Sequence, residues 1–265
     1  MLDIRCQLPV NKNVKTRFLA IHPLIGTKHK PSLLRYQQRS VYYWWWAYLR
    51  RNQEYLACCA RGGTGKLAGL YADFGDVRED DFRAWWGGKQ QRGAYLFGEQ
   101  PSDLVVRKVD ASSDWLPAWD ADDRVMVVAV NMAVGRRQLQ AHFARLLAKE
   151  HKGRRGRIAM ATVTSTARYP LHRNFSVHNL KMMLAAYDAW AANEQLPRDQ
   201  RKTQWQLGES IRLVAGAVTT KNDADAVDKR NTMSAAFNRA VKQAKLIIAN
   251  TARGEFPNST PPPSK

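Results

Sequence analysis

Apolar side chains recur with a helical period along most of the chain. Between Tyr36 and Ala60 this spacing predicts one helix, because apolar residues three and four positions apart share a helix face. The residues at this spacing are Tyr42, Trp45, Trp46, Leu49 and Leu56. Glycines at 62, 63 and 65 end the pattern, and two short helices are predicted beyond them, over 66–76 and 80–88.

Four longer helices are predicted in the second half of the chain. The first covers 136–151, with Leu139, Phe143, Leu146 and Leu147 on one face. The second covers Ser176–Asn193, where the Ser176 hydroxyl can cap the amino terminus. The last two cover 203–216 and 225–251. The final helix carries an apolar stripe of Met233, Phe237, Val241, Ala244 and Ile248.

Two segments rich in valine, 103–109 and 124–130, are the best candidates for β-strands, and they can pair with each other. The pattern as a whole therefore predicts a mainly α protein with a small β element. Serine, proline and aspartate cluster over 110–123, which favours a domain boundary there. The expected parts are an arm or irregular cap (1–36), an aromatic-rich helical domain (37–120), a basic helical domain (121–256) and a disordered tail (257–265).

Charge narrows the class of partner. The 265 residues include 42 Lys and Arg against 23 Asp and Glu, a net charge of +19, while 45% of the residues are hydrophobic. Such a chain can bury a core, and its positive surface favours a polyanion, so we expect a nucleic acid. No apolar run reaches the roughly 18 residues that a bilayer needs, and the amino terminus lacks an apolar signal core. These features predict no membrane association and a cytoplasmic, nucleoid-associated location.

The last two predicted helices have the layout of a helix-turn-helix motif, in which the second helix enters the major groove. Basic residues lie opposite the apolar stripe of the last helix: Arg239 and Lys242, flanked by Asn238 and Lys245. The joining segment GAVTTKNDA is longer than the tight turn of the simplest motif, so a winged or loop-extended variant fits better. A helical hairpin with a solvated basic face is the alternative interpretation.

A second basic cluster follows the predicted helix 136–151. In the segment HKGRRGR, glycines separate Lys152, Arg154, Arg155 and Arg157, so that the backbone can follow a groove while the basic groups reach phosphates. Arg168 and Arg173 extend this candidate surface. A solvated run of charge after a helix carboxyl terminus is the alternative.

Five consecutive aromatic residues, 42–46, suggest either stacking on unpaired bases or packing inside the protein. Packing is the favoured interpretation. Since five successive helical residues point in nearly all directions, we also expect a protein partner or self-association through the aromatic helix Tyr42–Tyr48.

No catalytic residue or metal site can be derived from the spacing of side chains. The segment RGGTGKL lacks the first glycine and the Ser or Thr of a phosphate loop, which excludes nucleotide hydrolysis by that mechanism. Five carboxylates, Asp73, Asp76, Glu79, Asp80 and Asp81, could gather a metal ion but also suit a helix start. Cys6, Cys58 and Cys59 have neither disulfide-framework nor zinc-knuckle spacing. We expect no cofactor.

The stretch WWAYLRRNQEY, Trp45–Tyr55, resembles a segment of transcriptional-regulator-like proteins carried on proteobacterial integrative elements and phages. This resemblance implies DNA binding in a mobile-element or defence context, and it carries over no catalytic residue.

The sequence therefore predicts a protein that binds double-stranded DNA, rather than RNA, through a basic helical surface. Three alternatives remain open at this point. They are a single-stranded DNA or RNA binder that uses its aromatic residues, a structural subunit of a nucleoprotein complex, and a metal-dependent nuclease.

Overall fold

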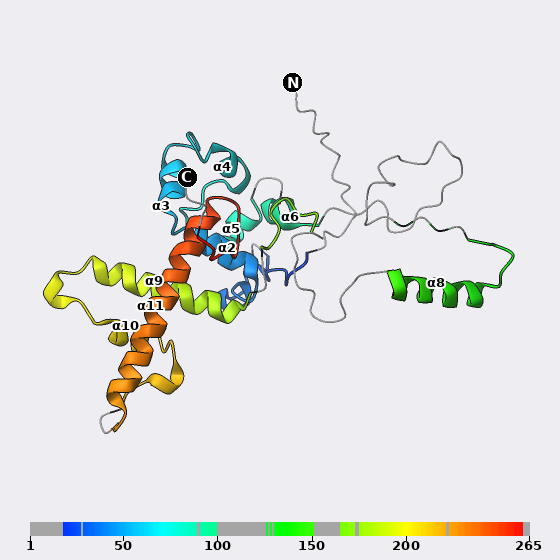
Figure 1. Cartoon of the computed structure of the whole chain (residues 1–265). Coiled ribbons are helices and arrows are strands. Elements are labelled where there is room, and N and C mark those ends of the chain that lie inside the picture. The colour runs from blue at the N-terminus through cyan, green and yellow to red at the C-terminus, as the bar shows by residue number, and fades with distance from the viewer. Residues whose placement is uncertain are drawn as a thin grey trace. The chain divides into compact units, whose positions relative to one another are not determined.

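The computed structural model describes residues 18–27, 29–88, 91–99, 126, 128, 130–150, 165–172, 175–220 and 223–261. The described part of the chain is mainly helical, as expected. Its helices are α1 (Leu34–Gln37), α2 (Val41–Leu49), α3 (Gln53–Ala60), α4 (Ala68–Phe74), α5 (Phe82–Trp86), α6 (Arg92–Phe97), α8 (Arg136–Glu150), α9 (Val177–Glu194), α10 (Gln204–Ser210) and α11 (Ala226–Thr251) (Figure 1). Short 3₁₀ turns cover Arg198–Gln200 and Ala215–Ala217.

No strand occurs within these described ranges, which contain two isolated bridges, Gly26 with Pro31 and Leu171 with Phe256. The β element that the sequence predicts is therefore not seen. Segment 103–109 and most of 124–130 lie outside the described residues, as does the predicted boundary at 110–123.

The chain divides into two compact units, one formed by 1–101 with 159–265 and the other by 102–158. In the first unit, the residues on either side of 100–164 lie next to each other. Glu99 accepts hydrogen bonds from the Ser165 hydroxyl (2.7 Å) and from the backbone N–H of Thr166 (2.7 Å). The backbone N–H of Tyr169 donates to the Leu96 carbonyl at 3.0 Å. These contacts hold together the two positions between which the second unit is inserted.

The predicted single helix over Tyr36–Ala60 is wrong, because three helices occupy this stretch. Ser40 and Asn52 separate them. The Ser40 hydroxyl accepts from the N–H of Tyr42 (3.3 Å), and the Asn52 side chain accepts from the N–H of Tyr55 (2.9 Å). Each side chain satisfies a free backbone donor at a helix start, so each begins a new helix.

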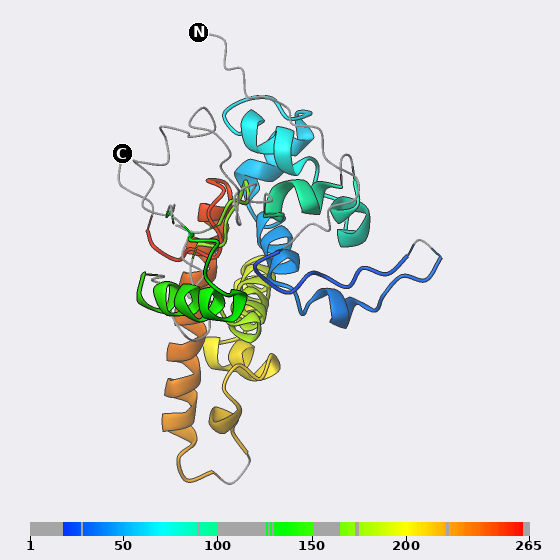
Figure 2. The same ribbon diagram turned by 90° about the vertical axis from the view of Figure 1, so that its right-hand side faces the viewer.

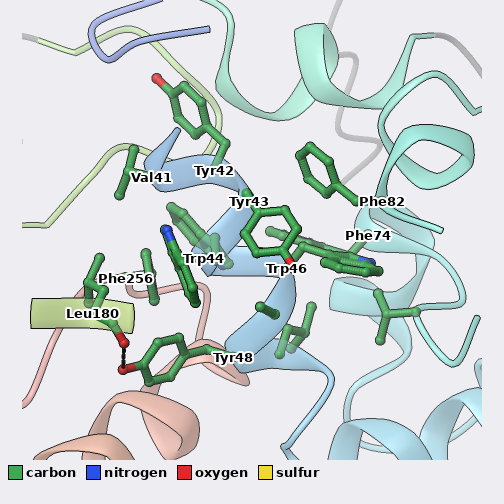
Figure 3. Close-up of a cluster of buried hydrophobic side chains, with 14 of the residues drawn as sticks. Val41, Tyr42, Tyr43, Trp44, Trp46, Tyr48, Phe74, Phe82, Leu180 and Phe256 are labelled. Atoms are coloured by element: carbon green, nitrogen blue, oxygen red, sulfur yellow. Dashed lines mark hydrogen bonds between the residues drawn. The ribbon is translucent and has the colours of Figure 1, made fainter. Parts of the chain in front are cut away.

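Helix α2 is buried on every side and forms the centre of an aromatic core. All nine of its residues are at most 9% exposed. Figure 3 shows its rings pointing outward among Phe74, Phe82 and Phe256, with the Tyr48 hydroxyl donating to the Leu180 carbonyl at 2.9 Å. A helix that is apolar all round belongs in a protein interior. The packing interpretation of the aromatic run is therefore confirmed.

A second, smaller cluster joins α9, α10 and the middle of α11. Its buried residues are Ala186, Leu207, Phe237, Ala240 and Val241. Later residues of α11, including Ala244 and Ile248, pack into the aromatic core instead. Figure 1 and Figure 2 show α11 running past α9 toward α2 while its amino-terminal turns extend away from the aromatic core. The predicted apolar stripe of α11 is confirmed, since all five of its residues are buried.

Helix α10 ends at Ser210, earlier than the predicted 203–216, because the backbone at Arg212 is left-handed (φ 50°). Within α10, Gly208 allows close packing on α11: a Cβ there would lie 2.7 Å from the Met233 side chain. The predicted disordered tail, 257–265, is ordered over its described part, since Asn258 is buried and its carbonyl accepts from Asn250 at 2.8 Å.

Candidate nucleic-acid interface

The exposed side of α11 carries basic residues opposite the buried stripe. No Asp or Glu occurs between 229 and 254, so the helix carries no negative side chain after its first turn. Arg239 and Lys242 lie one turn apart on this exposed side, opposite the buried stripe. We call these two residues the α11 basic pair.

The α11 basic pair has no carboxylate partner among the described residues. Many other basic side chains of this unit are engaged. Examples are the ion pairs of Arg50 with Asp80, Arg51 with Asp188, Arg78 with Asp76, Arg201 with Glu194 and Lys229 with Asp223. Arg239 and Lys242 are therefore free to meet an external anion.

The two flanking candidates on α11 are engaged inside the protein. The Asn238 amide donates to the Gln204 side-chain oxygen at 2.7 Å, which ties α11 to the start of α10. The Lys245 ammonium lies 3.3 Å from the centre of the Trp190 ring, a cation–π contact with α9. Both residues are exposed, yet each already has a role in holding the helices together.

Arg168, the other described candidate, is also engaged. Its guanidinium pairs with Asp73 at 2.9 Å and lies over the Tyr95 ring, 5.2 Å from the ring centre. The Tyr169 hydroxyl donates to the same carboxylate at 2.6 Å, and burial raises the pKa of Tyr169. Arg168 thus helps to hold its loop against α4. Lys152, Arg154, Arg155, Arg157 and Arg173 lie outside the described residues.

Helix α8 in the second unit matches its predicted range, and none of its residues is buried. Phe143 is 39% exposed and Leu147 is 38% exposed. Its basic side chains Arg136, Arg137 and Arg145 are exposed as well. This helix presents an apolar side and basic side chains at the same time.

The aromatic helix cannot contribute a stacking surface or a partner interface. Tyr43, the most exposed ring of α2, is only 9% exposed. The structure does not support the expected self-association or protein partner through Tyr42–Tyr48, because the rings pack against other helices of the same unit. Base stacking on this run is excluded for the same reason.

Four of the five carboxylates considered for a nuclease make structural contacts: Asp73, Asp76, Asp80 and Asp81. Asp73 binds Arg168 and Tyr169, while Asp76 pairs with Arg78, which lowers the pKa of Asp76. Asp81 caps α5 by accepting from the N–H of Ala84 at 2.9 Å. No three His, Cys, Asp or Glu side chains within the described ranges are grouped so that they could hold a metal ion.

The segment RGGTGKL, 61–67, joins two helices rather than a strand and a helix. Gly62, Gly63 and Gly65 are left-handed there, and a Cβ at Gly63 would overlap the Tyr71 ring. These glycines therefore serve a tight α3–α4 connection.

Sequence reasoning missed one feature, an open hollow on α10 lined by Lys202, Trp205, Gln206, Glu209 and Ser210. The Arg230 guanidinium lies over the Trp205 ring at 4.7 Å. The sequence contained a signal for this feature. Trp205 lies about 200° around the helix from the buried Leu207, so it is on the side opposite the apolar stripe.

Comparison with protein-family models, curated proteins and solved structures finds no match to this chain. None of the described helices is both long and apolar enough to span a bilayer.

Proposed function

We propose that this protein binds nucleic acid, with duplex DNA favoured, through the exposed basic side of α11. The observation that carries the proposal is the α11 basic pair: two exposed basic residues without a carboxylate partner among the described residues, on a helix that has no acid from 229 to 254. In a chain of net charge +19, such a face attracts a phosphate backbone and gains from the release of its counterions.

The dimensions of α11 suit this role. Its 26 residues make a rod of about 39 Å, long enough to lie in or across a DNA groove. Helix α10 braces it through Leu207, Gly208 and the Asn238–Gln204 hydrogen bond, as the first helix of a helix-turn-helix motif braces the second. The connection runs over 211–225, well beyond the three or four residues of the simple motif, so we propose a loop-extended arrangement.

A second candidate function is that of a structural subunit in a nucleoprotein assembly. The exposed Phe143 and Leu147 of α8 favour it, since apolar side chains beside basic ones suit a protein that contacts both a protein partner and nucleic acid. The resemblance of Trp45–Tyr55 adds a mobile-element context to either proposal. Its tryptophans are core residues here, so it does not identify a DNA contact.

The test is binding of the purified protein to labelled duplex DNA, single-stranded DNA and RNA across a salt series. We expect tight binding to duplex DNA with an affinity that falls steeply as salt rises. Weak binding to all three at low salt would overturn the proposal, because the positive charge would then serve another acidic partner.

A further inference from the structure

Trp205 is a large aromatic residue placed outside the protein core. It belongs to neither hydrophobic cluster, although it is half-buried. Other tryptophans on the described helices do pack against one of the clusters; examples are Trp45, Trp85 and Trp190. The Trp205 ring instead forms part of the wall of the α10 hollow. Core packing therefore does not explain the presence of a tryptophan at position 205.

Arg230 holds the indole from the side of α11. Its guanidinium lies over one face of the ring, 4.7 Å from the ring centre, in a cation–π contact, so a ligand can stack only on the opposite face. The Asn238–Gln204 hydrogen bond joins the same two helices next to Trp205 in sequence. Because Asn238 precedes Arg239, this hydrogen bond places the hollow on α10 close to the turn of α11 that bears the α11 basic pair.

The hollow is lined by both positively and negatively charged residues. Lys202 supplies an ammonium group, and Glu209 supplies a carboxylate. Two donors of Thr219, its N–H and its hydroxyl, bind one oxygen of Glu209 and lower the pKa of that carboxyl, so it stays charged. The remaining lining residues are Gln206, whose side-chain oxygen accepts from Thr203, and Ser210, whose hydroxyl donates to the Leu207 carbonyl.

This mixture selects for a particular ligand chemistry. A simple anion would meet the Glu209 carboxylate, and a simple cation would meet the Lys202 ammonium group. A nucleotide satisfies all of them, because its base has a flat π-face for the indole, its amino groups can donate to a carboxylate, and its phosphate suits an ammonium group. In a paired duplex that π-face is covered by neighbouring base pairs, so only an unpaired base can stack here.

We propose that the α10 hollow holds one unpaired base of a bound nucleic-acid strand, stacked on Trp205 with its phosphate near Lys202. This inference rests on the proposed function and refines it. The basic side of α11 then attracts the backbone, and the hollow recognises a strand end, a loop or an extruded base.

The first test compares binding of a single-stranded oligonucleotide of about 15 nucleotides with binding of a duplex of the same sequence. Trp205→Ala should weaken single-strand binding roughly tenfold, whereas Trp205→Phe should keep most of it, because stacking of one base on an aromatic ring is lost only in the first variant. Duplex binding should change by less than about twofold in both.

Tyr95→Ala is the matched control. Tyr95 is 40% exposed and lies under the Arg168 guanidinium, so it is an aromatic–cation pair outside the hollow. It should leave single-strand binding unchanged. An equal loss in the Trp205→Ala and Tyr95→Ala variants, or no loss in Trp205→Ala, overturns the inference.

The second test uses the wild-type protein, so it does not depend on how any variant folds. A single-stranded oligonucleotide carrying 4-thiothymidine is photo-crosslinked, and the modified peptides are identified by mass spectrometry. The inference expects the modification on tryptic peptide 203–212, whose one aromatic residue is Trp205. Crosslinks found only elsewhere overturn it. If crosslinking contradicts the base site while duplex binding keeps its salt dependence, only this inference is overturned. If the protein binds no nucleic acid, both this inference and the proposed function are overturned.

Discussion

Helices α2 and α11 use their side chains in opposite ways. Each of the nine residues of α2 is buried, and none is charged. Helix α11 buries one stripe and presents Arg239 and Lys242 on its other side. A helix with no exposed side can contribute only to stability. A helix with exposed basic residues can have those residues replaced and stay folded. Substitutions in the two helices should therefore separate stability from binding.

The largest expected effect is on α2. Trp45→Ala removes a fully buried ring that contacts Phe74, Phe97 and Phe256, so it should lower the free energy of unfolding by about 3–5 kcal/mol. Urea denaturation followed by circular dichroism measures the change. A loss below about 1 kcal/mol would show that α2 is not the centre of the core.

A smaller loss is expected where α4 holds the loop at 165–172. Asp73→Ala leaves the Tyr169 hydroxyl and the Arg168 guanidinium without their acceptor, which should cost about 2 kcal/mol of unfolding free energy. Asp199→Ala, at an exposed position, is the control and should change stability by less than about 0.5 kcal/mol. Loss of a magnesium-dependent cleavage activity at unchanged stability would instead revive the nuclease hypothesis.

Alkaline pH should weaken the core through its tyrosines. Burial raises the pKa of Tyr42 from 10.0 to about 12, so its ionisation is harder in the folded state than in the unfolded state. The stability that follows from this shift is complete below pH 10 and is lost as the pH rises through 12, by about 3 kcal/mol from Tyr42 alone. The free energy of unfolding, measured against pH for the wild type and Tyr42→Phe, should fall less steeply in the variant. An equal pH dependence in the wild type and in Tyr42→Phe would contradict the raised pKa of Tyr42.

The smallest effect on stability is expected on α11. The double variant Arg239→Ala with Lys242→Ala should keep its unfolding free energy within about 0.5 kcal/mol, yet bind duplex DNA about tenfold more weakly. Arg61→Ala with Lys66→Ala is the matched control, since it removes two exposed basic residues from the α3–α4 connection. It should bind almost as the wild type does. A double α11 variant that unfolds more easily than this control would place the pair in the core instead.

Periodicity predicts α9 and α11 well, because their apolar stripes and the Ser176 cap are local features. It fails over Tyr36–Ala60, where the dense aromatic run at 42–48 fits one long helix and hides the breaks on either side, although Ser40 and Asn52 are typical cap residues. It also overextends α10, whose end depends on the backbone at Arg212.

The candidate site is predicted only in part for a related reason. Arg239 and Lys242 follow from the helix pattern alone. Whether a basic residue is free depends on partners far away in sequence, as for Arg168 and Asp73, which are 95 residues apart. No periodic pattern contains that pairing. The hollow at Trp205 likewise depends on a tertiary contact, because Arg230 of α11 lies over the Trp205 ring of α10.

The salt dependence of duplex DNA binding tests the central claim most directly. Plotted as the logarithm of the binding constant against the logarithm of salt concentration, the wild-type slope should be steep. The Arg239→Ala, Lys242→Ala variant should reduce its magnitude by about 2, since each lost phosphate contact accounts for about 0.9, while the Arg61→Ala, Lys66→Ala variant should match the wild type. Three equal slopes, or a slope near zero for the wild type, would contradict binding through α11.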